Sequence, residues 1–192
     1  MMKSPLLTMA ILAVLACCTW SCGDSASEAA TTAPTENTIN QPAGNPNAKL
    51  VGEKWLRGQL SAQLGSQKLN LSGASQTELN GIEVTKSQAT YGEDETTIVS
   101  ITDLGKFGSN LGGVTPWLGK SINSTTGSSF QRSSYVENYP SLETYNAEKQ
   151  LATISALVGN RFLVTATSTS MRTTQLRDAV ATMELEDLAK GE

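Results

Sequence analysis

Four acidic side chains lie close together between residues 93 and 103 of this 192-residue sequence. Glu93, Asp94 and Glu95 are consecutive, and Asp103 follows within the next predicted strand. Carboxylate oxygens are the ligands that Ca²⁺ and Mg²⁺ prefer in proteins. However, the ligand spacing of an EF-hand is absent, and acidic residues are common in turns between strands. We therefore expect a turn here and no metal site.

Asp103 has a second possible role, because a carboxylate beside Gly105 could act as a general acid or base. The alternative is that it caps the turn that follows a strand. Arg161 comes directly after a predicted hairpin turn, so its guanidinium could reach Asp103 or Glu137 across a sheet. We predict a structural ion pair between Asp103 and Arg161.

Most common catalytic designs are excluded by composition. The sequence has no histidine, which excludes Ser-His-Asp triads and His-ligated metals. Its three cysteines are Cys17, Cys18 and Cys22, so the remainder of the chain has no thiol nucleophile and no iron–sulfur ligand. Phosphate-binding and dinucleotide-binding glycine motifs are also missing. We expect a non-enzymatic protein without a cofactor; the alternative is a hydrolase or lyase that uses carboxylate, lysine or tyrosine side chains.

The cysteines lie at the end of an apolar run, residues 6–18, that follows Lys3. A membrane-spanning helix needs about 20 apolar residues, so the run is too short for one and fits the apolar region of a signal peptide. Residues 1–24 resemble bacterial lipoprotein precursors. In that family a peptidase cuts before a cysteine, which then carries acyl chains. The resemblance implies an anchor in the membrane.

Two cysteines fit that processing pattern. Val14-Leu15-Ala16 precedes Cys17 in the usual order of an aliphatic and then a small residue, whereas Cys22 follows Ser21 and leads directly into a polar segment. We place lipidation at Cys22, because the Gly23-Asp24 that follows resembles the start of surface lipoproteins in some Gram-negative bacteria. Cys17 is the alternative. A soluble secreted protein, with the cysteines in its discarded signal peptide, is another interpretation.

The predicted organisation is a signal peptide (1–21), a lipidated cysteine with a disordered tether (22–48), and a globular domain (49–192). The tether is rich in small and polar residues, which bury too little apolar area to fold. Of the 14 basic residues only Lys3 lies in the signal peptide, so 13 basic and 18 acidic residues remain, a formal charge of −5. This charge argues against nucleic acid as a partner. We expect a location in the cell envelope, at the outer membrane.

The hydrophobic pattern of the domain predicts an α+β fold: an antiparallel sheet of about five strands, with helices packed on it in two layers. Residues 65–79 are expected to form a loop. The expected strands are 81–91, 96–104, 129–138, 151–158 and 161–167, with a hairpin turn at Gly159-Asn160. Helices are expected near 50–64, within 105–122, and along the stripe of Leu176, Val180 and Met183.

The glycine-rich stretch 107–119 is the candidate interaction surface. Phe107, Trp117 and Leu118 are interleaved with small residues, and Thr115-Pro116 could begin a helix. Such a surface could form an apolar groove or contact a partner. The alternative is a crossover helix buried against the sheet.

Several short motifs between residues 80 and 188 resemble a group of small exported bacterial proteins that have no assigned activity. The motifs are Gly81, Ala89-Thr90-Tyr91, Asp103-Leu104-Gly105, Tyr139-Pro140, Tyr145 and Leu157–Phe162. The resemblance implies a fold more than a function. We hypothesise a lipid-anchored, non-enzymatic module of a Gram-negative envelope that binds a protein partner or an apolar ligand. A purely structural surface protein is a further alternative.

Overall fold

The computed structural model describes residues 48–191. The predicted signal peptide lies outside these residues, and so does the predicted tether except for Ala48. The predictions about Cys17, Cys22 and acylation therefore concern a part of the chain that the structure does not describe. Within residues 48–191, no helix combines the length and the apolar character that a membrane crossing requires.

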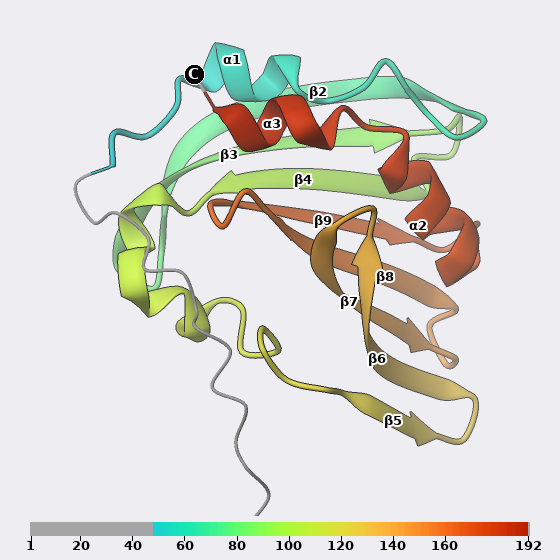
Figure 1. Cartoon of the computed structure of the whole chain (residues 1–192). Coiled ribbons are helices and arrows are strands. Elements are labelled where there is room, and N and C mark those ends of the chain that lie inside the picture. Colours follow the sequence, from blue (N-terminus) through green and yellow to red (C-terminus); the bar gives the residue numbers. More distant parts are fainter. Residues whose placement is uncertain (1–47, 192) are drawn as a thin grey trace, which may run out of the picture. The chain divides into compact units, whose positions relative to one another are not determined.

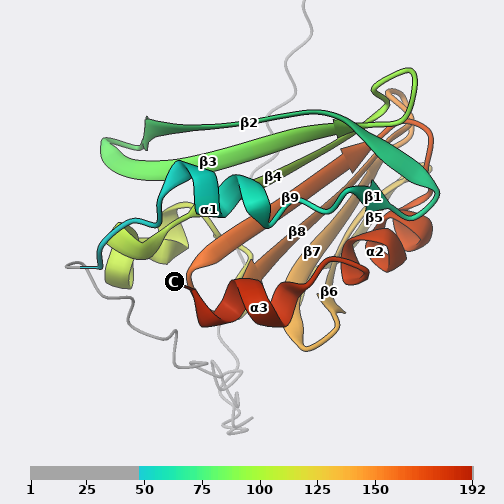
Figure 2. The ribbon, with the colours of Figure 1, turned by 90° about the horizontal axis from the view of Figure 1, so that it is seen from above.

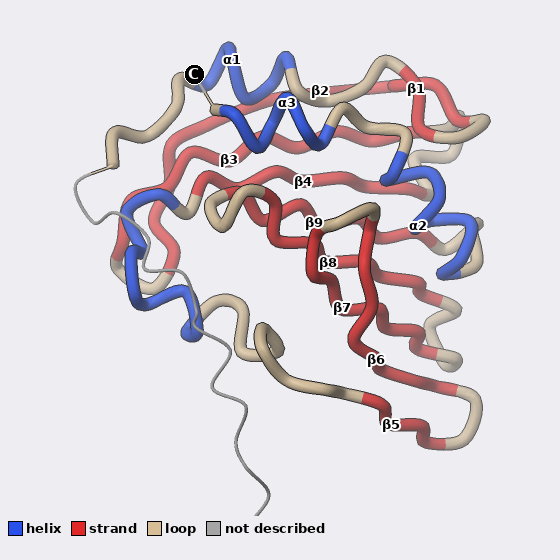
Figure 3. Tube along the Cα trace, viewed as in Figure 1, coloured by secondary structure: helices blue, strands red, loops and turns tan. Residues whose placement is uncertain are grey.

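Nine strands form one antiparallel sheet in the order β1-β2-β3-β4-β9-β8-β7-β6-β5 (Figures 1 and 3). The order consists of two series of consecutive strands, which meet where β4 pairs with β9. The strands are β1 (Gln63–Leu64), β2 (Gln67–Leu79), β3 (Ile82–Tyr91), β4 (Thr97–Asp103), β5 (Asn123–Thr126), β6 (Ser129–Val136), β7 (Tyr139–Asn146), β8 (Leu151–Val158) and β9 (Phe162–Ser168).

Three short α-helices and one 3₁₀ helix accompany the sheet in the described part of the chain. The α-helices are α1 (Glu53–Gly58), α2 (Thr173–Ala181) and α3 (Leu185–Lys190), and the 3₁₀ helix is η1 (Gly105–Gly113). Seen from above, α1, α2 and α3 lie over the strands (Figure 2). Contacts join α1 to β2 and β3, α2 to β6–β9, and α3 to β8.

The predicted α+β fold with about five strands in two layers is wrong. The structure is mainly one large antiparallel sheet of nine strands, with only short helices. The largest error is β2, which occupies most of the stretch that the sequence predicts as a loop. No side chain of β2 is fully buried, so the alternating apolar pattern of a half-buried strand is absent. Instead, β2 is held in place by its pairing with β3 and by the turn at Asn80-Gly81. The backbone φ angles of these two residues are positive, 51° and 76°, as a tight hairpin turn requires.

The helix predictions are correct only in part. The predicted helix near 50–64 is reduced to the six residues of α1, with Gly52 before it and Gly58 as its last residue. The predicted helix within 105–122 is η1, which ends before Pro116. The predicted stripe of Leu176, Val180 and Met183 is buried, but the chain divides there into α2 and α3. The predicted hairpin of β8 and β9 is confirmed.

The sheet has two different faces. On the covered face, the three α-helices pack on alternate residues such as Val99 and Ile101 of β4 and Val164 and Ala166 of β9, which form the main hydrophobic core. On the open face, the intervening residues of the same strands are partly exposed, except at one end. There a second, smaller cluster that includes Phe107 of η1 covers the sheet.

Candidate functional site

Asp103 lies at the end of β4 on the covered face, with its side chain fully buried. Its Oδ1 accepts hydrogen bonds from the Gly105 backbone N–H (2.9 Å) and from Arg161 Nε (2.8 Å). Its Oδ2 accepts from Arg161 Nη2 (2.7 Å) and from the Val51 backbone N–H (2.8 Å). The two residues that the sequence pairs are thus joined by a bidentate contact, the strongest geometry for this kind of pair.

The Asp103–Arg161 pair holds together three segments that are distant in the sequence. Arg161 also donates from Nη2 to the Lys49 carbonyl (2.8 Å), and its guanidinium carbon lies 5.0 Å from the centre of the Phe162 ring. A Cβ atom on Gly105 would lie only 3.0 Å from Asp103 Oδ1. Because four donors occupy the carboxylate and the packing around it is tight, this geometry suits a structural clamp and not an acid or base.

Polar side chains of β3 complete the attachment of the first described segment. Thr85 Oγ1 donates to the Val51 carbonyl (2.9 Å) and Ser87 Oγ to the Leu56 carbonyl (3.2 Å). Tyr91 donates its hydroxyl to the Ser61 carbonyl (2.9 Å), and burial raises the pKa of Tyr91 to about 12. These bonds tie carbonyl groups in and around α1 to β3, and the Leu56 carbonyl also accepts from the Gln59 backbone N–H (3.2 Å).

A second buried carboxylate, Glu143 of β7, is surrounded by two arginines. Its Oε2 lies 2.6 Å from Arg132 Nη2 of β6, and its Oε1 lies 3.1 Å from Arg177 Nη1 of α2. Ser134 also donates to Oε1 (2.8 Å), while the exposed Asp178 lies 3.6 Å from Arg177 Nε. The cluster fastens α2 to the sheet.

The sequence analysis misses this cluster, because none of its expected strands includes residues 139–145. The residue spacing alone gives no sign that Glu143 faces Arg132. The available signal is the strand pairing: once β6 and β7 are placed as a hairpin, the two residues are direct cross-strand neighbours. Opposite charges at such positions attract each other.

The candidate interaction surface lies against the sheet. Phe107 and Trp117 are buried, with exposed fractions of 3% and 8%, and Leu118 is partly buried beside them. Together with Leu111 they pack on Leu157 and its neighbours at the covered end of the open face. Little of either aromatic ring is therefore available to a partner in this conformation.

The acidic turn also differs from a metal site. Glu93, Asp94 and Glu95 are exposed, and Glu95 accepts a hydrogen bond from Asn70 (2.9 Å). Across residues 48–191 no three Asp or Glu side chains converge in a way that could hold a metal ion.

A pocket with both apolar and polar lining lies on the covered face, between the β6–β7 hairpin and the start of α2. Its volume is about 430 Å³, within the usual range for small-molecule sites. Phe130 of β6 and Tyr145 of β7 face each other in it with ring centres 6.0 Å apart, and Met171 contributes a flexible apolar side chain. Hydroxyl and amide groups form the remainder of the lining, and Arg172, directly before α2, is its one charged residue.

Sequence reasoning does not identify this pocket. Phe130 and Tyr145 are direct cross-strand neighbours, which only the β6–β7 pairing reveals. Met171 comes from the segment between β9 and α2. We found no protein-family model, no curated protein and no solved structure that matches the chain.

Proposed function

We propose that this protein is a lipid-anchored, non-enzymatic module of a bacterial envelope, attached to the outer membrane through Cys22. In this proposal the domain binds an apolar ligand, or an apolar side chain of a protein partner, in the pocket of Phe130, Tyr145 and Met171. The observation that carries the binding role is the pair of facing aromatic rings in an open cavity of about 430 Å³. The anchor rests on the cysteine pattern of residues 1–24.

The surroundings of the pocket support binding more than catalysis. The two buried carboxylates of the sheet, Asp103 and Glu143, are both occupied by arginines and lie outside the pocket lining. The lining contains no Asp, Glu or Lys. An apolar group that enters the pocket would gain the contact area of two rings and a methionine, and the polar rim would orient it.

The pocket is tested with an uncharged apolar dye, N-phenyl-1-naphthylamine, added to the full-length protein in a mild non-micellar buffer. Dye fluorescence should rise on binding, and Phe130→Ala should weaken binding at least several-fold. Tyr135→Ala is the matched control, because Tyr135 lies on the same strand with 67% of its surface exposed and is absent from the pocket. Equal effects of the two substitutions, or no binding at all, would contradict the pocket assignment.

The anchor is tested separately by acyl labelling in bacteria. Cys22→Ser should abolish labelling and release the protein from the membrane fraction, whereas Cys17→Ser should retain both. Loss of labelling only with Cys17→Ser would move the site to Cys17. If neither substitution matters, the protein is not a lipoprotein, while the dye experiment still decides the binding role.

A further inference from the structure

Hydroxyl and amide side chains form rows across the open face, beyond the end that η1 covers. One row crosses six adjacent strands from β3 to β6, and none of its residues is buried: Thr90, Ile98, Thr167, Thr153, Thr144 and Gln131. The next row begins with Gln88 and Ser100 and continues through Thr165 and Ser155. Neighbouring strands are about 4.8 Å apart, so the rows present hydrogen-bonding groups at regular intervals.

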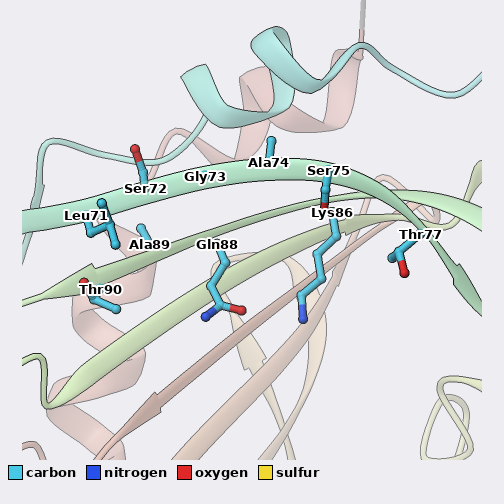
Figure 4. Close-up of a pocket in the computed structure, with 10 residues that line it drawn as sticks. All are labelled: Leu71, Ser72, Gly73, Ala74, Ser75, Thr77, Lys86, Gln88, Ala89 and Thr90. Atoms are coloured by element: carbon cyan, nitrogen blue, oxygen red, sulfur yellow. The ribbon is translucent and has the colours of Figure 1, made fainter.

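A groove of about 530 Å³ lies at one end of these rows, between β2 and β3. Figure 4 shows Lys86, Gln88 and Thr90 extending from β3 toward one side of the sheet, together with Leu71 and Thr77 of β2. Ala74 points the opposite way, toward the side of α1. A second groove, of about 360 Å³, lies at the other end of the rows, over β5–β8. The two grooves and the rows thus belong to one extended polar surface.

This surface is almost free of charge. Lys86 is the single charged side chain in the two rows and the two grooves. In addition, Thr90 Oγ1 is buried in the groove between β2 and β3 and has no hydrogen-bond partner among the described residues. A buried hydroxyl without a partner costs free energy, which a ligand hydroxyl would recover once the side chains around Thr90 Oγ1 move aside to admit it.

We infer that the open face binds a neutral polysaccharide, with the groove between β2 and β3 as the strongest contact. Hydroxyl groups of a sugar both donate and accept hydrogen bonds, as Ser, Thr and Gln side chains do. A neutral polymer matches this surface because neither side must desolvate an unpaired charge. The exposed side chains of Leu71 and Ile98 offer apolar contacts to the C–H faces of sugar rings.

Other partners fit this surface less well. Interface cores between proteins are enriched in aromatic residues, Met and Arg and are depleted in Ser, whereas these rows are rich in Ser and Thr. A lipid surface would require basic and large apolar side chains together. The inference rests on the groove between β2 and β3, which shares no lining residue with the pocket of Phe130, Tyr145 and Met171. Phe130 and Tyr145 line both that pocket and the second groove.

The first experiment is affinity electrophoresis of the full-length protein through gels that contain one polysaccharide each. The neutral probes are dextran, laminarin and galactomannan, and alginate is the anionic probe. We expect at least one neutral probe to retard the protein, with the same retardation in 0.5 M NaCl, because screening weakens only charged contacts. No retardation by any neutral probe, retardation by alginate alone, or a loss of retardation in salt would overturn the inference.

The second experiment compares two threonines of β3 that face opposite sides. Thr90→Val should reduce the affinity for the retained polysaccharide about threefold to tenfold, as expected for one lost hydrogen bond, without lowering the melting temperature. Thr85→Val removes the hydrogen bond to Val51 on the covered face, so it should lower the melting temperature and leave the affinity of the folded protein unchanged. Gln88→Ala, at an exposed position, is a second binding variant that does not depend on whether Thr85→Val folds, because it should weaken binding in a stable protein. Equal affinities for Thr90→Val, Gln88→Ala and the parent protein would refute the site.

Discussion

On the covered face, polar side chains hold distant parts of the chain together, whereas on the open face their counterparts in the same strands are left exposed. Ser87 of β3 is buried and donates to the Leu56 carbonyl at 3.2 Å. Ser155 of β8 is partly exposed, and its hydroxyl has one long hydrogen bond within residues 48–191, to Thr165 Oγ1 at 3.5 Å. Both serines lie in paired strands, so strand pairing alone does not require the additional hydrogen bond that Ser87 makes on the covered face. The polar groups on the covered face attach helices and termini. On the open face, Ser133 attaches the segment at Lys120 and Ile122, while the polar groups of the uncovered rows are available for binding.

The largest expected effect concerns the clamp on the covered face. Asp103→Ala removes the acceptor of two backbone N–H groups and of the Arg161 guanidinium. Removal of one partner from a buried ion pair costs about 3–5 kcal/mol, because the other charge and its donors are left unpaired. Urea denaturation should show this loss. A loss below about 1 kcal/mol would mean that the clamp does not fasten the segment before α1.

The second prediction tests the covered end of the open face. Trp117 is 8% exposed and packs with Phe107, Leu111 and Leu157. Trp117→Ala should therefore cost about 3 kcal/mol in urea denaturation, since it leaves a cavity between η1 and the sheet. If the stability is unchanged while capture of an envelope partner is lost, Trp117 belongs to an interaction surface, as the sequence first suggests.

The third prediction concerns alkaline pH and the hydroxyl of Tyr91 on the covered face. Its pKa is raised from 10.0 to about 12 by burial, so between pH 10 and 12 the unfolded chain releases this proton while the folded protein keeps it. The free energy of unfolding should therefore be independent of Tyr91 below pH 10 and fall by roughly 2–3 kcal/mol as pH rises to 12.

Tyr91→Phe is the control for the alkaline experiment. It loses the hydrogen bond to the Ser61 carbonyl but no longer ionises, so its loss of stability between pH 10 and 12 should be smaller than that of the parent. Burial and the nearby carboxylates of Glu186 and Glu137 also raise the pKa of Tyr139, so a weaker dependence should persist in the variant. Identical pH profiles for the two proteins would show that Tyr91 is not held as described.

The sequence predicts those elements of this fold that alternate strongly. The strands β3, β4, β6, β8 and β9 alternate in residue type along at least part of their length, and all five are found close to their predicted positions. The strands β1, β2, β5 and β7 are missed. In β2 and β5 no side chain is buried, because these strands lie toward the edges of the sheet and their order comes from pairing with a neighbour.

The candidate sites show the same limit. The pairing of Asp103 with Arg161 follows from two strand ends that the sequence does predict, and the structure places them 2.7 Å apart. The pocket and the Glu143 cluster depend on the register between β6 and β7, which no local pattern specifies. The burial of Trp117 depends on where η1 lies over the sheet, so composition alone leaves its role open.

The most direct test of the difference between the two faces is a comparison of Ser87→Ala with Ser155→Ala in urea denaturation at neutral pH. Both substitutions remove one hydroxyl from a serine in a central part of the sheet. The account predicts a loss of about 1 kcal/mol for Ser87→Ala, which removes a hydrogen bond between β3 and α1 and leaves the Leu56 carbonyl with the Gln59 backbone N–H alone, and a change within about 0.5 kcal/mol for Ser155→Ala. Equal losses, or a larger loss for Ser155→Ala, would contradict the conclusion that the covered face builds the fold and the open face is free to bind.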